Sequence, residues 1–415
     1  MPQAAKLEFN MNVLFISISS MPHISKHSIS LDLIHEFQRN GHDVYVVCAR
    51  EKKENAETEL CCEAGCKVLR VKIGNNKKAN IIEKGITTVL LPTYYIKAIK
   101  KYYSDVKFDL VLYPTPPVTQ VKTVKYIKKR DGAKSYLLLK DIFPQNAVDI
   151  GMMSRGGVKG ILYRHFRKQE KQLYAVSDKI GCMSDANVEY VLKHNSEVKR
   201  DKIEVCPNAI EITDMSVTDA EREEIRNKYG IPLDKKVFVY GGNLGRPQGI
   251  PFIINCLRAN ENNSEAYFLI VGDGTEYGKL EAYVNENKPQ NVRLMKKLPK
   301  EDYDKMVASC DVGMIFLDHR FTIPNFPSRL LSYMQAGIPT LACTDPNTDV
   351  GKVIEGDGFG WWCESNDVNA FTNCVNRATA ELEGGRASFK NAAFKSLRTR
   401  YDITNAYATV MKSIK

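Results

Sequence analysis

The stretch NFPSRLLSYMQAGIPTLA, residues 325–342, predicts a helix that leads directly into a strand. Pro327 and Ser328 suit the cap and first turn of a helix, and a glycine followed by a proline ends it before the apolar run. Arg329 would then lie in the first turn, where its positive charge opposes the helix dipole. This placement indicates a bound anion; the ordinary alternative is an exposed arginine on an amphipathic helix.

Short apolar runs rich in β-branched residues alternate with helical patterns on both sides of this stretch. They include NVLFISIS and HDVYVVCA early in the chain, and VFVYGGN and CDVGMIFL later. Such alternation is typical of parallel sheets built from strand–helix–strand units, whose ligands bind at the carboxyl ends of the strands. The sequence therefore predicts an α/β fold with doubly wound sheets.

The pattern restarts near residue 206, which predicts two successive doubly wound domains with a cleft between them. We expect a first domain over residues 11–205, a second over 206–385, and C-terminal helices over 386–415 that pack back toward the first domain. Residues 1–10 precede Met11, an alternative start, and lie outside the expected domains.

The composition is that of a globular protein, with 43% hydrophobic and 26% charged residues. No apolar run approaches the ~18 residues that a membrane span needs, and the N-terminus lacks the features of a secretory signal. The eleven cysteines are an odd number and lie mostly in apolar stretches, which favours a reduced cytosolic protein over a disulfide framework. A metal knuckle at Cys61, Cys62 and Cys66 is a less favoured reading, because no partner motif follows.

The positive charge is concentrated in the first half. Residues 1–200 hold 33 of the 59 lysines and arginines and 20 of the 49 acidic residues, a balance of +13 within a net charge of +10. This asymmetry indicates an anionic partner for the first half: nucleic acid, a phospholipid surface or a diphosphate substrate.

A second candidate anion site is VYGGNLGRPQG, residues 239–249, between a strand and a helix. Its glycines do not match G-x-G-x-x-G, so a nicotinamide-type site is not favoured. Gly241 and Gly242 would let the backbone approach a ligand closely, and Arg246 would supply charge. A tight strand–helix turn is the alternative, although it explains the glycines and not the arginine.

Four motifs of the chain resemble those of a known enzyme family. YGGNLGRPQGI, FLIVGDG, PSRLLSYMQAGIPTLA and KDIFPQNAVDIGMM resemble the retaining glycosyltransferases of family 4, which have the GT-B fold of two Rossmann-like domains facing a central cleft. They are most similar to bacterial enzymes that build capsule or O-antigen repeat units. The resemblance spans Asn12 to Lys415 and implies a UDP-sugar donor on the second domain and a lipid-diphosphate-linked saccharide acceptor on the first.

Carried over by position, the resemblance implies a set of donor-binding residues. The donor phosphates would contact Gly242 and Asn243. The family often has a phosphate-binding lysine where this chain has Gln248, and Arg246 would supply the missing positive charge. The nucleotide base would be bordered by Gly272, Asp273, Lys297 and Leu298, and the diphosphate would be held by Pro327, Ser328, Arg329 and Leu330. Ser332 stands where the family holds the ribose hydroxyls.

The chain departs from the family at two positions. Two glutamates that the family commonly carries fall here on Pro324 and Ser332. Asp345 and Asp349, after the next strand, are the nearby carboxylates that could substitute. The sequence shows no convincing DxD motif or histidine cluster, so neither a metal ion nor another cofactor is expected.

Candidate catalytic residues lie in the first half. Asp141 follows an apolar strand, where a carboxylate could orient the acceptor hydroxyl or take its proton, and Lys140 could contact the acceptor diphosphate. A structural aspartate is an equal alternative. The loop after the first strand carries His23, Lys26 and His27 at a place where the family often contacts donor phosphate.

Segment 90–108 mixes tyrosines and isoleucines with lysines, as suits a membrane interface. Segments 121–130 and 163–172 add further basic residues. Together they predict peripheral docking on an anionic membrane at the inner face of the cell membrane. The alternative for 90–108 is an ordinary amphipathic helix packed on the sheet.

The sequence thus favours a retaining glycosyltransferase. Two alternatives share its fold: a catalytically inactive GT-B partner subunit, which would explain the absent glutamates, and a UDP-sugar epimerase. Nucleic-acid binding is not favoured, because the basic stretches lie on separate elements without a recognition motif.

Overall fold

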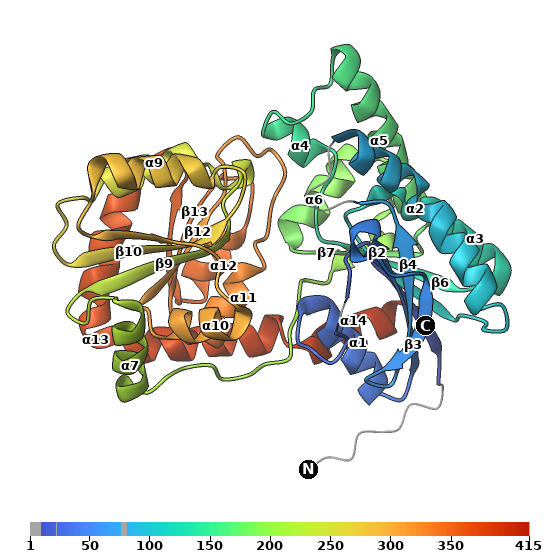
Figure 1. Cartoon of the computed structure of the whole chain (residues 1–415), viewed down its shortest axis with the longest axis horizontal. Coiled ribbons are helices and arrows are strands. Elements are labelled where there is room, and N and C mark those ends of the chain that lie inside the picture. Colours follow the sequence, from blue (N-terminus) through green and yellow to red (C-terminus); the bar gives the residue numbers. More distant parts are fainter. Residues whose placement is uncertain (1–9, 22, 76–80, 415) are drawn as a thin grey trace. The chain divides into compact units, whose positions relative to one another are not determined.

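The computed structural model describes residues 10–21, 23–75 and 81–414. The chain divides into two compact units, Met1–Glu211 together with Asp402–Lys415, and Ile212–Tyr401 (Figure 1). The C-terminal helix α14 (Ile403–Ile414) therefore belongs to the first unit. Helix α13 (Val368–Arg400) runs without a break through residue 386, where the sequence suggested the start of separate C-terminal helices.

The first unit is built on an eight-stranded sheet with the strand order β3-β4-β2-β1-β5-β6-β7-β8. Its strands are parallel except for β3, which pairs antiparallel with β4. The strands are β1 (Asn12–Ile16), β2 (Asp43–Glu51), β3 (Glu59–Glu63), β4 (Cys66–Ile73), β5 (Leu110–Pro114), β6 (Lys134–Leu139), β7 (Lys179–Cys182) and β8 (Ile203–Val205).

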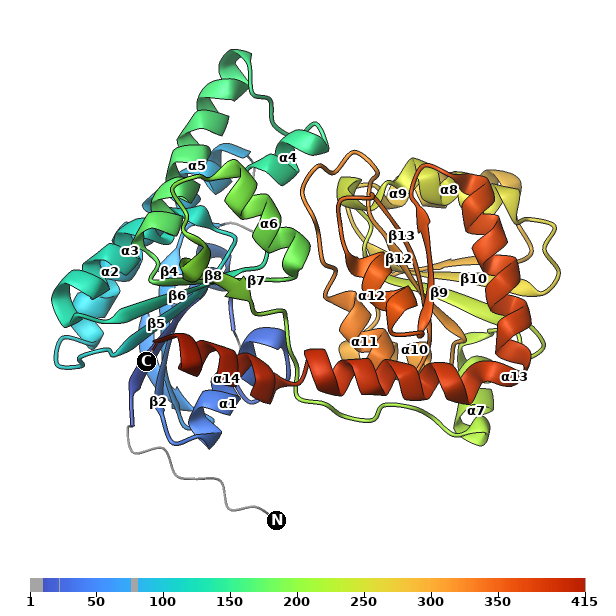
Figure 2. The same ribbon diagram turned by 180° about the vertical axis from the view of Figure 1, so that it is seen from behind.

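The helices of this unit are α1 (Ile29–Arg39), α2 (Ile81–Tyr102), α3 (Val121–Asp131), α4 (Gln145–Asp149), α5 (Gly157–Val176), α6 (Asp185–His194) and α14. Helices α1 and α14 lie side by side in both views (Figures 1 and 2). They share one apolar core with the central strands, in which Phe37 of α1 packs edge-on against Tyr407 of α14.

The hairpin of β3 and β4 was not anticipated from the sequence. Cys61 and Cys62 lie on β3, and Cys66 begins β4 after a turn in which Ala64 and Gly65 have positive φ. These cysteines are therefore placed by strand pairing, and the three thiols are free.

Helix α2 contains most of the segment predicted to meet a membrane. Tyr95, Ile99 and Tyr103 are all at most 1% exposed. The Tyr95 hydroxyl donates a hydrogen bond to Ser17 O at 2.6 Å, and the Tyr103 hydroxyl donates one to Lys67 O at 2.9 Å. The prediction that these aromatic side chains face a membrane is wrong, because they fill the core beneath the helix.

The second unit has a six-stranded parallel sheet with the order β11-β10-β9-β12-β13-β14. Its strands are β9 (Lys236–Asn243), β10 (Ala266–Asp273), β11 (Val292–Met295), β12 (Val312–Phe316), β13 (Thr340–Thr344) and β14 (Gly360–Glu364). Its helices are α7 (Asp219–Tyr229), α8 (Ile250–Ala259), α9 (Tyr277–Asn287), α10 (Lys300–Ala308), α11 (Arg329–Gln335), α12 (Val350–Gly356) and α13.

Both faces of this sheet are covered, as its continuously apolar strands require. Helices α8, α9 and α13 share a core with alternate residues of β9, including Phe238 and Tyr240. On the other face Tyr333 of α11 packs against Gly313 of β12, where a Cβ would come within 2.3 Å of the tyrosine ring. The predicted α/β fold with two doubly wound sheets is thereby confirmed.

Candidate functional site

The candidate donor site begins where β9 and β10 end together. Gly242 pairs with Gly272, and Asn243 pairs with Asp273. A Cβ on Gly272 would lie 2.0 Å from the carbonyl oxygen of Gly242, so no other residue fits there without a shift of the backbone. Gly272 is thus required by the close approach of two strands, whatever ligand lies beyond them.

Arg329 reaches the same place from the start of α11. Its guanidinium carbon lies 4.3 Å from the ring centroid of Tyr240, which is a cation–π contact. Gly242 has φ +123°, and a Cβ there would fall 2.1 Å from Nη2 of Arg329. The structure therefore brings together two residues predicted separately, with the arginine occupying the space that the glycine leaves.

The charge of Arg329 is not neutralised by an acidic side chain. The side chain is half-buried, and the groups that act on its charge are Tyr240, Tyr303 and Tyr333. Within the described ranges no carboxylate forms an ion pair with it. A half-buried cation without a counterion is what an anion site provides before its ligand binds.

The backbone before α11 offers fewer free amides than the sequence suggested. The amide of Leu330 donates to Pro327 O at 3.2 Å, and that of Leu331 donates to Ser328 O at 3.2 Å. Leu330 therefore cannot contribute a free amide while this turn persists. Among the residues described, the amides of Ser328 and Arg329 make no such bond.

Gln248 organises the loop that follows β9. Its Oε1 accepts hydrogen bonds from Asn243 Nδ2 at 2.9 Å and from the amide of Gly245 at 3.1 Å. Arg246 is exposed, and its Nε lies 4.0 Å from Glu276 Oε1. Of the two arginines, Arg329 is thus the one held beside the β9 terminus.

Gly241 was predicted to let the backbone approach a ligand closely, but it packs against α10 instead. A Cβ there would lie 1.8 Å from the hydroxyl of Tyr303, so the residue is small because α10 packs on it. Burial raises the pKa of Tyr303 to about 12.

A turn after β13 holds the loop that precedes α11. Asp345 is fully buried, and its Oδ1 accepts hydrogen bonds from the amides of Asn347 at 2.9 Å and Thr348 at 3.3 Å. Those residues in turn bind the carbonyl oxygens of Phe321 and Asn325. Asp345 therefore supports the loop from inside, and it does not present a carboxylate at the surface in place of the absent glutamates.

The other predicted donor residues lie around this edge without contacts that define a role. Lys297 is exposed and Leu298 half-buried between β11 and α10, Ser332 is half-buried within α11, and Pro324 is buried. The backbone oxygen of Asp273 accepts from Leu244 N at 2.9 Å, and its carboxylate accepts from Gly274 N at 2.8 Å. Their roles toward a donor remain predictions.

In the first unit, Lys140 and Asp141 follow β6 and are half-buried. Asn146 Nδ2 donates to Asp141 Oδ1 at 2.7 Å. Burial disfavours the charged forms, and it raises the pKa of Asp141 to about 6 and lowers the pKa of Lys140 to about 8. A carboxyl that titrates near neutrality is suited to proton chemistry.

Thr115 fixes the Lys140–Asp141 segment and was not anticipated from the sequence. This buried hydroxyl donates to Asp141 O at 3.1 Å and accepts from the amides of Lys140 and Asp141 at 3.1 and 3.3 Å. Tyr240 was missed as well. Both residues act through neighbours that are distant in sequence, so no local pattern marks them.

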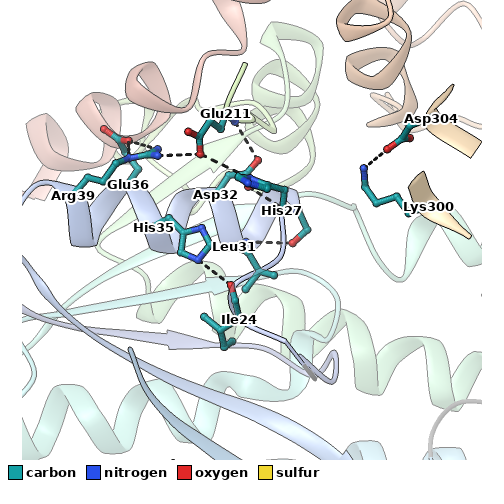
Figure 3. Close-up of polar contacts among 11 residues, drawn as sticks. Ile24, His27, Leu31, Asp32, His35, Glu36, Arg39, Glu211, Lys300 and Asp304 are labelled. Atoms are coloured by element: carbon teal, nitrogen blue, oxygen red, sulfur yellow. Dashed lines mark hydrogen bonds and ion pairs between the residues drawn. The ribbon is translucent and has the colours of Figure 1, made fainter. Parts of the chain in front are cut away.

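The three residues of the loop after β1 that were predicted to contact donor phosphate differ in their surroundings. His23 and Lys26 are exposed. His27 Nδ1 lies 3.1 Å from Asp32 Oδ1 and 3.8 Å from Glu211 Oε2, as Figure 3 shows. The imidazole therefore faces the carboxylates of Asp32, in the first turn of α1, and of Glu211, after β8. Its contact with a donor phosphate stays a prediction.

Comparison with known proteins finds similar chains that are named as glycosyltransferases. Over 307 residues, 74% of each chain, the protein is 25% identical to a Pseudomonas aeruginosa protein named as a glycosyltransferase, WbjE. Over 278 residues, 66% of each chain, it is 22% identical to the Escherichia coli K12 protein WcaI, named as a colanic acid biosynthesis glycosyl transferase. The structure of Anabaena HepE in complex with UDP superimposes with a TM-score of 0.68 at 14% identity, covering 97% of this chain and 99% of that one.

Two family models match, one on each unit. Residues 29–214 match the model described as Glycosyltransferase Family 4, and residues 221–396 match the model described as Glycosyl transferases group 1. Together they account for most of the chain, and the sheets are those of the GT-B fold. The chain therefore belongs to the family 4 glycosyltransferases of the GT-B fold.

Proposed function

We propose that the protein is a retaining glycosyltransferase that moves a sugar from a UDP-sugar to a lipid-diphosphate-linked saccharide during synthesis of a bacterial surface polysaccharide. The observation that carries the proposal is Arg329 held over Gly242 at the end of β9, half-buried and without a carboxylate partner in the described part of the chain. The UDP complex of HepE and the colanic acid role in the name of WcaI support the donor and the pathway class.

In this proposal Arg329 binds the diphosphate of the donor, and the amides of Ser328 and Arg329 add hydrogen bonds. Negative charge grows on the diphosphate as the bond to the sugar breaks. A cation already fixed on Tyr240 by stacking stabilises that charge without reorganising, so it lowers the barrier as well as binding the donor.

The acceptor hydroxyl attacks the sugar on the face that the diphosphate leaves. The bond between the anomeric carbon and the phosphate oxygen breaks, the new glycosidic bond forms, and the hydroxyl proton passes to an oxygen of the departing diphosphate. Asp141 accepts a hydrogen bond from the acceptor hydroxyl and orients it, and Lys140 contacts the acceptor diphosphate. The protein works at the inner face of the cell membrane, where a lipid-linked acceptor is found.

A second function has a specific observation in its favour. Pro324 and Ser332 stand where the family commonly has glutamates, so a GT-B subunit that binds nucleotide sugars without transferring them would fit the same fold. An epimerase would convert a UDP-sugar with no acceptor present.

The test is a panel of nucleotide sugars incubated with the purified chain and lipid-diphosphate-linked acceptors, read by mass spectrometry and by NMR of the new anomeric centre. We expect transfer from a UDP-sugar with retention. Arg329→Ala should weaken UDP-sugar binding about 10- to 100-fold, the loss expected for a charge-assisted contact to phosphate. Its stability should fall by only about 1 kcal/mol, the value of the stacking on Tyr240.

Arg377→Ala is the matched control, because Arg377 is an exposed arginine of the same unit whose ion pair, among the described residues, is with Glu381 on its own helix. It should bind the donor like the wild type. Binding without transfer would favour the inactive subunit, and turnover of UDP-sugar alone would favour the epimerase. Undiminished donor affinity in Arg329→Ala would refute the proposed donor site.

A further inference from the structure

The segment from α4 to the first half of α5 stands out from the rest of the first unit (Figures 1 and 2). The tip is compact: the carbonyl oxygen of Arg155 lies against Gly160, where a Cβ would approach it to 2.4 Å, and Gly160 N donates to Gly156 O at 2.9 Å. The guanidinium of Arg155 lies 5.9 Å from the ring centroid of Tyr163. These contacts fix the loop on the helix.

Apolar side chains gather on this tip. Met152, Ile161 and Leu162 are 59%, 63% and 49% exposed. They are three of the eight large apolar side chains that are exposed among the described residues, and they fall within eleven positions of one another. Isolated exposed apolar residues are ordinary, but a cluster at the end of a projecting element marks an interaction surface.

Basic side chains continue the surface along α5. Between residues 152 and 172 the sequence holds six basic residues and one acidic residue, Glu170. Glu170 is buried and engaged by Arg167 and Tyr174, so it offers no charge to the surface. Arg164 and Lys168 are exposed, and among the residues described neither forms an ion pair.

A hollow of about 480 Å³ opens on the same helix. Tyr163, Arg164, Arg167, Lys168 and Lys171 line it, with Glu197 on its rim paired to Lys171 at 3.1 Å. The hollow is thus a positively charged depression beside an exposed apolar tip, which complements a layer of anionic headgroups over an acyl region.

We propose that the α4–α5 tip is the membrane-docking surface of this protein: Met152, Ile161 and Leu162 enter the interface of an anionic bilayer, while Arg164 and Lys168 bind headgroup phosphates. The inference rests on the proposed function in one respect only, that a lipid-linked acceptor must be reached at the bilayer. It moves the docking surface from α2, whose Tyr95 and Ile99 are core, to α5. No helix in the described part of the chain is long and apolar enough to cross a membrane.

The experiment is flotation of the full chain with vesicles of phosphatidylcholine alone and of equal parts phosphatidylcholine and phosphatidylglycerol. The wild type should float only with the anionic vesicles. Ile161→Asp/Leu162→Asp should abolish flotation, and Arg164→Ala/Lys168→Ala should weaken it about 30-fold, as expected for two basic side chains near an anionic surface.

Val89→Asp/Leu90→Asp is the matched control, because these side chains of α2 are also exposed, at 54% and 39%, and the charge change is the same. It should float like the wild type. Flotation of the Ile161→Asp/Leu162→Asp variant at the wild-type level, or equal loss in the control, would overturn the inference. The inference would also be overturned if the wild type did not bind vesicles and the tip variants differed from it in oligomeric state, since the tip would then bind another copy.

The same variants separate this inference from the proposed function. UDP-sugar binding by the tip variants should be unchanged, because the donor residues lie in the other unit. A wild type that floats but binds no nucleotide sugar would refute the transferase proposal alone, and a wild type that binds donor but never floats would refute only the docking surface.

Discussion

At the scale of single residues, burial shifts the pKa values of two neighbouring side chains in opposite directions. Asp141 and Lys140 are neighbours at the end of β6, and the pKa of the acid is raised to about 6 while that of the base is lowered to about 8. The shifts share one cause, because a buried site disfavours either charge. Thr115 holds the backbone of both residues and so fixes the two groups in place.

Asp141→Asn tests whether this carboxylate contributes to the reaction. An ionised Asp141 accepts a hydrogen bond from the hydroxyl of the acceptor saccharide better than a protonated one does. Wild-type turnover should therefore rise as the pH increases through about 6. The variant should be slower by about 100-fold, in the range of general acid–base effects, and should lack that rise. The measurement is turnover against pH at saturating donor.

Stability gives the control for this variant. A raised carboxyl pKa means that the folded state favours the protonated form of Asp141. The resulting contribution to the stability of the fold is fully present below the usual carboxyl pKa of 3.8 and is lost as the pH rises through about 6. At pH 8 Asp141→Asn removes a buried charge and should unfold at the same or a higher temperature. A purely structural aspartate would instead lose stability and leave the pH profile unaltered.

At the scale of elements, one buried carboxylate joins four pieces of the second unit. Asp311, just before β12, is 3% exposed. Its carboxylate forms ion pairs with Arg222 and Arg226 of α7 and with Arg386 of α13. It also accepts a hydrogen bond from Val237 N of β9 at 2.7 Å. Arg226 is itself 1% exposed, so its charge depends on this partner.

Asp311→Ala should therefore destabilise the second unit by about 3–5 kcal/mol, since it leaves a buried guanidinium without its counterion. Chemical denaturation of the second unit is the measurement. Asp357→Ala is the comparison, because its partner Arg400 is 49% exposed in its side chain, and it should cost about 1 kcal/mol or less. Equal losses in both variants would contradict the role given to Asp311.

At the scale of the whole molecule, the last helix completes the core of the first unit. Ile403, Tyr407 and Val410 of α14 are buried against α1 and the central strands. His42 Nε2 and the Tyr407 hydroxyl lie 2.9 Å apart in this core, joining positions 365 residues apart. The core of the first unit is therefore incomplete without α14.

Val410→Asp should unfold the first unit or destabilise it by more than about 3 kcal/mol, because it buries an unpaired charge. Ala408→Asp on the same helix is exposed and should change stability by about 0.5 kcal/mol or less. Hydrogen exchange resolved by segment should show lost protection in α1 and β1 for the first variant, with the second unit unaffected. Protection retained in α1 would contradict the dependence on α14.

By itself, the sequence determined the class of fold, the strands and helices apart from the β3–β4 hairpin, and the two glycine- and arginine-bearing motifs, because strand and helix periodicity and turn chemistry are local properties. Only the tertiary structure decided that Arg329 lies over Gly242 and that Asp345 is internal. It also decided that α2 buries Tyr95 and Ile99 while α5 exposes Ile161 and Leu162. The reason is physical: an amphipathic pattern reports that a helix has an apolar face, but whether that face meets core or solvent depends on the elements that pack against it.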